Sequence, residues 1–208
     1  EAAVYAAGLA LWQRRLCEQV DAFAVPSAFA LQRLRTLGAP VGDRARVVGS
    51  VQREIAARSA AAEGEHVLAA GRLTPEKGFD DAIEAARIAG LPLVIAGDGP
   101  QAAELRARAA GADVRFTGVL GAGELAELRS RAGAAIVPSR YEEILPLAAL
   151  EGMAAGLPVV ASRAGGLAEP TVELAQPRRR GRQQLDDPIA IHRALPPAPR
   201  AVERDCER

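Results

Sequence analysis

Five short apolar runs dominate the middle of the chain. They are "HVLAAG" (66–71), "LPLVIAG" (91–97), "VRFTG" (114–118), "AAIVPS" (134–139) and "PVVAS" (158–162). Their apolar residues are nearly continuous rather than alternating with polar ones, which is typical of strands buried on both faces. We therefore predict that these runs are the strands of one parallel sheet.

The segments between the runs have helical character and polar flanks. They cover residues 79–90, 100–111, 122–133 and 145–156, and each ends near a glycine that can terminate a helix. Strands that alternate with helices predict an α/β fold, a doubly wound parallel sheet of the Rossmann-like kind with helices on both faces.

The two ends of the chain differ from this pattern. Residues 1–20 have apolar positions at helical spacing, and a short apolar run at 21–27 predicts a strand. Residues 171–208 have clustered arginine and proline without lasting periodicity, so we expect a tail that is disordered or out of frame. Because this tail has no evident strand, we expect Val159 and Val160 to lie on an exposed sheet edge.

Composition narrows the possible functions. The formal net charge is zero and aromatic residues make up 3% of the chain, so nucleic acid is not an expected partner. No apolar run approaches the roughly 18 residues of a transmembrane segment. Cys17 and Cys206 lack the spacing of a metal site or disulfide framework, which favours a reducing cytoplasm. His66 and His192 belong to no recognisable catalytic triad.

The loop "GRLTPEKG" (71–78) follows the first predicted strand and contains Arg72 and Lys77, the only lysine in the chain. Ligands of a doubly wound sheet bind at the carboxyl ends of its strands. An arginine and a lysine directed into one crevice would suit a diphosphate. The alternative is that both are solvated loop cations.

A second candidate stretch, "SRYEEILPLAALE" (139–151), follows the strand at 134–139. Glu143 precedes a predicted helix that begins near Pro146, and Glu151 lies inside that helix. First-turn amides can bind phosphate, and carboxylates can accept hydrogen bonds from sugar hydroxyls. The alternative is that Glu142 and Glu143 complement the helix dipole while Glu151 is solvated.

Together these stretches resemble the donor-binding domain of GT-B glycosyltransferases, in particular the retaining enzymes of family 4. The resemblance covers roughly residues 20–170 and rests on five motifs in the family's order. These are Gly71, Arg72, Leu73, Lys77 and Gly78; Gly97, Asp98, Gly99 and Pro100; Val114, Phe116 and Gly118; Glu143 and Glu151; and "GLPVVAS" followed by Gly165 and Gly166.

The resemblance implies a role for each matching residue. Arg72 and Lys77 would neutralise the diphosphate of a nucleotide-sugar donor, so no obligatory metal or cofactor is expected. Glu143 would hold the donor sugar and Glu151 the ribose hydroxyls. The remaining implied donor-binding residues are Val119 and Leu120, which would flank the base, and Gly71, Gly97, Leu145 and Leu147. The resemblance also implies that the strands ending at residues 70 and 137 meet at the topological switch point of the sheet.

The same resemblance implies a hexose transferred from the donor to a hydroxyl acceptor that the sequence does not identify. Residues 1–20 resemble a connecting helix from an N-terminal acceptor domain that is missing here, residues 21–170 the donor-binding domain, and residues 171–208 no part of the family. One departure is Pro146, expected at the first helical position, where the family usually has glycine. Alternatives are a GT-B-fold nucleotide-sugar epimerase and a non-catalytic nucleotide-sugar-binding fragment.

Overall fold

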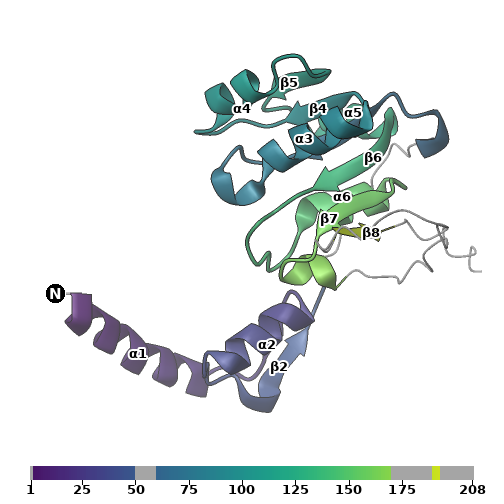
Figure 1. Ribbon diagram of the computed structural model, residues 1–208. Coiled ribbons are helices and arrows are strands. Elements are labelled where there is room, and N and C mark those ends of the chain that lie inside the picture. Colours follow the sequence, from purple (N-terminus) through teal and green to yellow (C-terminus); the bar gives the residue numbers. More distant parts are fainter. Residues whose placement is uncertain (1, 50–59, 170–188, 193–208) are drawn as a thin grey trace, which may run out of the picture.

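A computed structural model describes residues 2–49, 60–169 and 189–192 of the 208-residue chain. In these ranges the chain forms a larger α/β part and a smaller N-terminal unit that lies at one end of it (Figure 1). No helix within the described ranges is long and apolar enough to cross a membrane.

The α/β part is built on a six-stranded sheet in the order β5-β4-β3-β6-β7-β8. Its strands are β3 (His66–Ala70), β4 (Leu93–Ala96), β5 (Val114–Gly118), β6 (Ala132–Val137), β7 (Val159–Ser162) and β8 (Ile189–His192). The first five pair in parallel. The predicted doubly wound parallel sheet is confirmed, and its five parallel strands match the five apolar runs.

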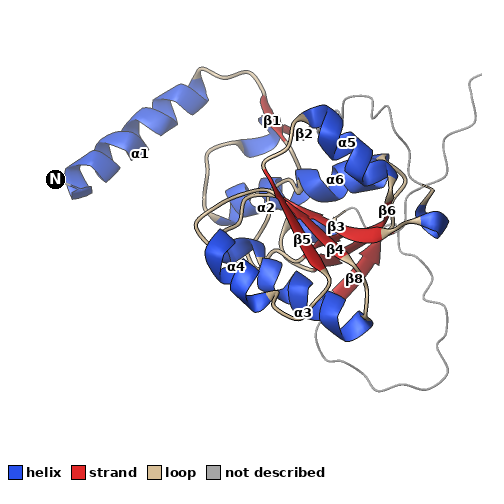
Figure 2. Cartoon of the chain, turned by 90° about the horizontal axis from the view of Figure 1, so that it is seen from above, coloured by secondary structure: helices blue, strands red, loops and turns tan. Residues whose placement is uncertain are grey.

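Helices cover both faces of this sheet (Figure 2). On one face α3 (Phe79–Ala89) and α4 (Ala102–Arg108) pack against β3 and β4, with Ile83, Leu93, Ile95 and Leu105 fully buried between them. On the other face α5 (Ala122–Ser130) and α6 (Leu147–Ala154) pack on a core that includes Leu68, Leu157 and Val159. Burial of the strands on both sides explains why they lack alternating polar residues.

The neighbours β3 and β6 are separated by more than 60 residues in the sequence, and they lie side by side in parallel. From β3 the chain moves outward through β4 to β5, and it then returns to β6 on the other side of β3. The strand order therefore reverses between β3 and β6. This reversal is the expected topological switch point, where an α/β fold opens a crevice.

The edge beyond β7 differs from the sequence expectation. Residues Ile189–His192 form β8 and pair antiparallel with β7, so that Ile189 lies opposite Ser162 and His192 opposite Val159. Val159 and Val160 are thus not on a free edge. The short run "IAIH" was overlooked because charged and proline-rich residues surround it. The remainder of the expected disordered tail, 171–188 and 193–208, lies outside the described residues.

The N-terminal unit has a sheet of its own. It comprises α1 (Ala2–Glu18), β1 (Phe23–Val25), α2 (Ala28–Thr36) and β2 (Ala45–Val47), and β1 pairs in parallel with β2. Val25, Ala30, Val41 and Ala45 form its small core. The predicted helix at 1–20 and strand at 21–27 are observed. Although we placed residues from 21 onward in the donor-binding domain, β1 and β2 are not part of the six-stranded sheet.

Four single turns of 3-10 helix complete the described elements. They are η1 (Gly42–Arg44), η2 (Ala61–Glu63), η3 (Pro75–Lys77) and η4 (Gly166–Ala168). η3 carries Lys77, and η4 begins at the second glycine of the Gly165–Gly166 pair.

Candidate functional site

Two loops meet at the switch point of the sheet. Residues 71–78 follow β3 and residues 138–146 follow β6. The backbone N–H of Arg140 donates to the carbonyl oxygen of Glu76 at 2.8 Å. Gly78 has a φ of +65°, and a Cβ at this position would overlap the carbonyl oxygen of Pro138. The glycine after Lys77 is thus required for the two loops to approach each other.

Lys77 and Glu143 form an ion pair across the two loops. Lys77 Nζ lies 2.6 Å from Glu143 Oε1, and the Glu143 side chain is only 7% exposed. Ser139 donates its hydroxyl to Glu143 Oε1 at 2.7 Å, and Tyr141 donates its hydroxyl to Glu143 Oε2 at 2.8 Å. Both carboxylate oxygens therefore have partners.

Tyr141 also contacts Lys77. Its hydroxyl lies 3.1 Å from Lys77 Nζ, which in turn lies 4.9 Å from the centre of the Tyr141 ring. An ammonium group over an aromatic face gains a cation–π attraction. Tyr141 thus supports both members of the ion pair.

These contacts keep both groups charged. Burial acts to lower the pKa of Lys77, but the hydrogen bonds with Glu143 and Tyr141 outweigh it and the pKa is raised. Burial acts to raise the pKa of Glu143, but the hydrogen bonds from Lys77, Ser139 and Tyr141 lower it. At neutral pH the site therefore contains one buried carboxylate and one partly buried ammonium group.

A cavity of about 310 Å³ opens beside this pair. Its lining includes Gly71, Arg72, Lys77, Glu143, Leu145 and Leu147. A second cavity of about 320 Å³ is lined by Gly71, Arg72, Gly97, Val119 and Leu120 among others. Because Gly71 and Arg72 line both cavities, the two cavities adjoin each other at the loop after β3. Nine of the ten predicted site residues thus line one or the other cavity.

The backbone at Gly97 approaches the loop after β3 very closely. A Cβ at Gly97 would overlap the carbonyl oxygen of Gly71, and the φ of Gly97 is +144°. The N–H of Gly71 donates to the carbonyl oxygen of Ala96 at 2.9 Å, and the N–H of Gly97 donates to that of Gly118 at 2.8 Å. These bonds hold the loop after β3 close to Gly97, which lines the second cavity.

Arg72 and Val119 are accessible to a ligand. Arg72 is exposed and forms no salt bridge with another described residue. Val119 is 79% exposed, whereas Leu120 is half-buried and packs against the core. The Arg72 guanidinium, which has no salt-bridge partner among the described residues, could bind an anion. The exposed Val119 side chain could pack against the face of a ring.

Glu151 is the tenth predicted residue, and its surroundings differ from those of the others. It lines neither of the two cavities, and its carboxylate forms an ion pair with Arg129 of α5, whose side chain is only 10% exposed. Arg129 was not predicted as a site residue, because a single arginine in a helix carries no signal of its own. The Glu151 carboxylate thus already has a partner within the protein, the Arg129 guanidinium.

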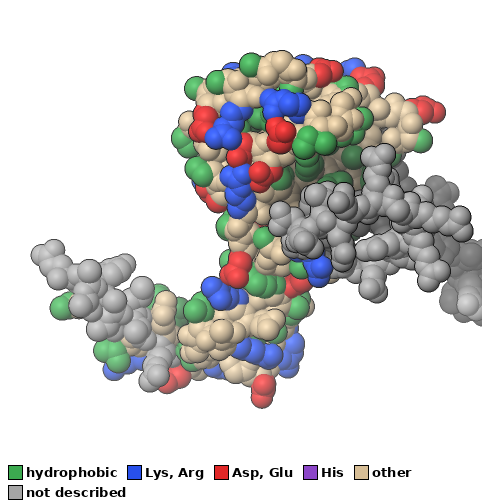
Figure 3. All heavy atoms as spheres, viewed as in Figure 1, with side chains coloured by type: hydrophobic (Ala, Val, Ile, Leu, Met, Phe, Trp, Pro, Cys, Tyr) green, Lys and Arg blue, Asp and Glu red, His purple; other side chains and the backbone are tan. Residues whose placement is uncertain are grey.

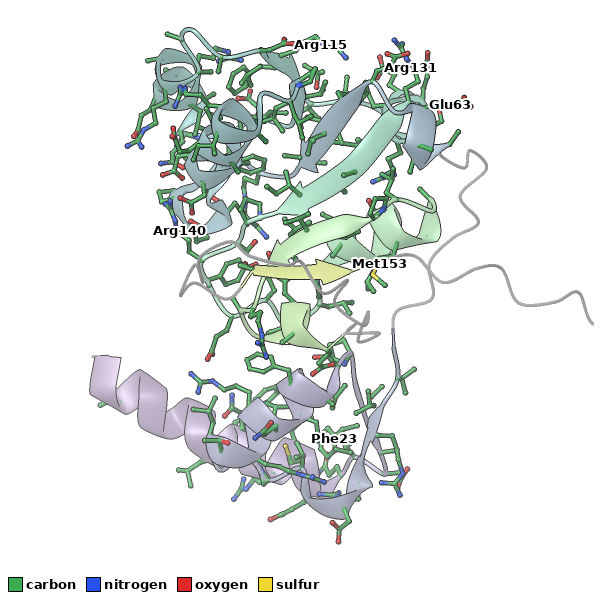
Figure 4. The ribbon with its side chains drawn as sticks, turned by 45° about the vertical axis from the view of Figure 1, so that its right-hand side comes forward. Phe23, Glu63, Arg115, Arg131, Arg140 and Met153 are labelled. Carbon is green, nitrogen blue, oxygen red and sulfur yellow. The ribbon has the colours of Figure 1, made fainter. Side chains whose placement is uncertain are left out.

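Arg140 ties the loop after β6 to α3. Its guanidinium lies 2.7 Å from Asp80 and 2.7 Å from Asp81 at the start of that helix. Hydrogen bonds with these two aspartates raise the pKa of Arg140. Arg140 is placed toward the N-terminal unit, whereas Glu63 and Arg131 lie at the opposite end of the sheet (Figure 4). Ser139, Arg140 and Tyr141 were missed although they directly precede Glu142 and Glu143.

The start of α6 differs by one residue from the prediction. The helix begins at Leu147 and Pro146 occupies the N-cap position, with φ −79° and ψ 80°. The N–H of Leu147 donates to the carbonyl oxygen of Leu145 at 3.0 Å. Pro146 therefore lies in the turn that precedes α6, and not in the first turn of the helix.

The described ranges contain no group of three or more His, Cys, Asp or Glu residues placed to hold a metal ion. The site as described is an ion pair, a second cation and two adjoining cavities at the carboxyl edge of a doubly wound sheet.

Comparison with protein families gives a match over residues 51–175, to the family described as glycosyl transferases group 1. This match covers more than half of the chain and includes every predicted site residue. The chain belongs to this family of transferases. Its sheet and helices are accordingly those of a GT-B glycosyltransferase domain.

Individual relatives agree with this assignment. The chain is 40% identical to a glycogen synthase of Mycobacterium tuberculosis over 147 residues, 61% of this chain and 35% of the relative. It is 42% identical to a GDP-mannose-dependent alpha-(1-6)-phosphatidylinositol dimannoside mannosyltransferase of the same species, over 48% of this chain and 27% of the relative. The chain thus spans about a third of the length of these relatives.

A solved structure supports the fold. The Anabaena protein HepE, in complex with UDP and glucose, superposes with a TM-score of 0.67 at 19% identity. The match covers 78% of this chain and 50% of HepE.

Proposed function

We propose that this chain supplies the donor-binding half of a retaining glycosyltransferase of the family 4 type. The complete enzyme would transfer a hexose from a nucleotide diphosphate sugar to a hydroxyl acceptor. The observation that carries the proposal is the Lys77–Glu143 pair at the switch point, beside the exposed Arg72, in a chain of the group 1 glycosyl transferase family.

In this proposal Arg72 and Lys77 bind the donor diphosphate. Both line the cavity of about 310 Å³, and two cations at this place would oppose the charge that develops on the leaving nucleotide. The charge is then neutralised by protein side chains, so that donor binding needs no metal ion. Lys77 can serve the diphosphate only by leaving or sharing its present partner, Glu143.

Glu143 is proposed to bind hydroxyl groups of the donor sugar. Its buried carboxylate is held by Ser139 and Tyr141, which would keep it oriented when Lys77 turns toward phosphate. Leu145 and Leu147 would line the apolar side of the same cavity.

The second cavity is proposed to receive the nucleoside. Val119 and Leu120 would flank the base. Gly71 and Gly97 have no side chains, so this part of the cavity lining leaves space for the donor. Glu151 would accept hydrogen bonds from the ribose while it remains paired with Arg129.

The named relatives support this donor class. One is a GDP-mannose-dependent mannosyltransferase, and HepE was solved with UDP and glucose. All three proteins named above are consistent with transfer or nucleotide-sugar binding, so the epimerase alternative gains no support from them. The acceptor is unassigned, and we propose that an N-terminal acceptor domain is needed to hold it.

Calorimetric titration of the chain with UDP, GDP, UDP-glucose and GDP-mannose, with and without EDTA, tests the donor site. We expect binding of at least one nucleotide diphosphate, unchanged by EDTA. Transfer to acceptors should be undetectable and donor hydrolysis slow, because proximity of the two substrates needs both walls of the cleft. Failure of all four nucleotides to bind would refute the donor-site proposal.

A further inference from the structure

Helix α2 of the N-terminal unit begins directly against the loop that carries Glu143. Ser27, the N-cap of α2, is 95% buried, and its hydroxyl oxygen accepts a hydrogen bond from the N–H of Ala30 at 3.0 Å. The same hydroxyl donates to the carbonyl oxygen of Ile144 at 2.7 Å. A serine hydroxyl has a single proton to donate, and in Ser27 that proton goes to the residue after Glu143.

The start of α2 is also bound by a carboxylate that is distant in sequence but adjacent in space. Glu169, just after η4, accepts hydrogen bonds from the N–H of Ala28 at 3.0 Å and from the N–H of Phe29. A negative charge is favourable at the N-terminus of a helix, where amide groups lack partners. Glu169 thus stabilises the first turn of a helix about 140 residues away.

The segment before Glu169 binds the Glu143 loop from the other side. The N–H of Gly166 donates to the carbonyl oxygen of Glu143 at 2.5 Å, and Gly165 forms a parallel bridge with Glu143. Leu167 is fully buried and anchors this segment to the core of the sheet. The Glu143 loop therefore lies between the start of α2 and the Gly165–Glu169 segment, which are themselves joined through Glu169.

An exposed ion pair between α2 and the Glu143 loop contributes little to holding the loop in place. Arg33 of α2 lies 3.4 Å from Glu142, but both side chains are more than half exposed. Exposed pairs of this kind contribute little to stability. Acidic and basic side chains are visible where the N-terminal unit meets the α/β part (Figure 3). On the side that faces the N-terminal unit, the loop is thus held mainly by Ser27, and Glu169 holds the helix that carries Ser27.

We propose that Ser27 and Glu169 are positioning residues for Glu143. Ser27 holds the backbone of the loop, and Glu169 holds the helix that carries Ser27. This inference rests on the proposed donor site, and it makes α2 part of that site although α2 lines neither of its two cavities. Such support matters because a binding carboxylate must be held to about 0.5 Å of its working position.

Amide hydrogen exchange of the full chain tests the inference in three variants. Glu169→Ala removes the carboxylate, Ser27→Ala removes the bond to Ile144, and Glu63→Ala is the control, an exposed glutamate at the opposite end of the sheet (Figure 4). We expect faster exchange of the amides of Ala28 and Phe29 in Glu169→Ala. In both test variants the amide of Gly166, which donates to the carbonyl oxygen of Glu143, should also exchange faster, and in Glu63→Ala none of these amides should change.

Affinity for UDP-glucose provides the second measurement. Loss of the supporting hydrogen bonds should weaken binding of UDP-glucose about fivefold in Ser27→Ala and Glu169→Ala, but binding of UDP less than about twofold, because Glu143 is assigned to the sugar. A positioning role predicts this difference, whereas a general loss of stability predicts equal weakening of both ligands.

Two results would overturn the inference. One is faster exchange at Ala28 and Phe29 in Glu169→Ala with unchanged exchange at Gly166. The other is equal weakening of UDP and UDP-glucose. If wild-type protein binds neither ligand, the donor-site proposal fails, and the exchange data still decide whether α2 holds the loop. Should Ser27→Ala fail to fold, the exposed Glu169 provides the deciding variant.

Discussion

Lys77 Nζ lies 2.6 Å from Glu143 Oε1, so the only lysine of the chain is bound to a buried carboxylate 66 residues further along. The two residues come from loops that the strand order brings together. In the proposed site they have different ligands, phosphate for Lys77 and sugar for Glu143. The following predictions separate these roles.

Lys77→Ala should weaken binding of UDP or GDP by about 1 to 3 kcal/mol, the scale of a lost charge-assisted contact. Calorimetry measures the change. Arg115→Ala is the matched control, because this exposed cation lies at the far end of the sheet (Figure 4). Equal nucleotide affinity of wild type and Lys77→Ala would show that the ammonium group does not bind the diphosphate.

Glu143→Gln should lower the free energy of unfolding at neutral pH but much less in acid. Because the pKa of Glu143 is lowered from 4.5, its contribution is present above that value and is lost as the pH falls through the folded-state pKa. The raised pKa of Lys77 keeps that side of the pair charged to above pH 10.5. Urea denaturation of both proteins should give a constant difference near neutral pH that shrinks below about pH 4.5.

The opposite pH profile, a difference that grows in acid, would mean that Glu143 is protonated in the native protein. Wild-type and Glu143→Gln proteins should also differ more in affinity for UDP-glucose than in affinity for UDP.

Gly97→Ala should destabilise the fold by more than about 1 kcal/mol, because alanine is strained at this φ and its Cβ would meet the backbone of Gly71. Gly123→Ala in α5 is the control, since a Cβ there would have no atom within 4 Å. Alanine favours helices over glycine, so this change should stabilise by up to about 1 kcal/mol. Thermal melting that ranks the two variants in the reverse order would contradict the described backbone.

Glu151→Ala should lower both stability and nucleotide affinity. Removing the carboxylate leaves Arg129 nearly buried without its partner, at a cost of about 3 kcal/mol. Arg129→Met is the comparison, because it removes the ion pair while keeping Glu151. If ribose binding belongs to Glu151, UDP affinity measured well below both melting temperatures should fall only in Glu151→Ala. Equal affinity losses in the two variants would indicate that the intact ion pair, and not a direct contact of Glu151 with the ribose, supports nucleotide binding.

The sheet was predictable because its strands are apolar on both faces. β3, β4 and β5 end within a residue of the predicted runs, which glycine and polar loops delimit. β8 was missed because four residues amid charged and proline-rich sequence give little periodicity. α2 and β2 were not predicted, since residues 28–65 are mixed in character. The separate pairing of β1 with β2 depends on tertiary contacts that no local pattern encodes.

The sequence predicted which residues belong to the site, but not the contacts between them. Sequence motifs identified Lys77 and Glu143 as neighbours of one ligand, but not as partners of each other, because their contact depends on β3 lying beside β6. The supporting roles of Ser139 and Tyr141 follow from side-chain directions that spacing alone does not determine. Ser27 and Glu169 were missed because they are about 140 residues apart in the chain, and no sequence pattern shows that they meet.

The Lys77–Glu143 contact also allows the proposed site to discriminate against the wrong anion. A free phosphate or pyrophosphate that draws Lys77 away leaves the buried carboxylate of Glu143 without its counter-charge, and this opposes binding. A complete donor offers phosphate to the lysine and hydroxyl groups to the glutamate in the same event. Under the proposed roles, the sugar hydroxyl groups compensate Glu143 for the contact that the phosphate breaks, so free phosphate and pyrophosphate should compete poorly with a complete donor.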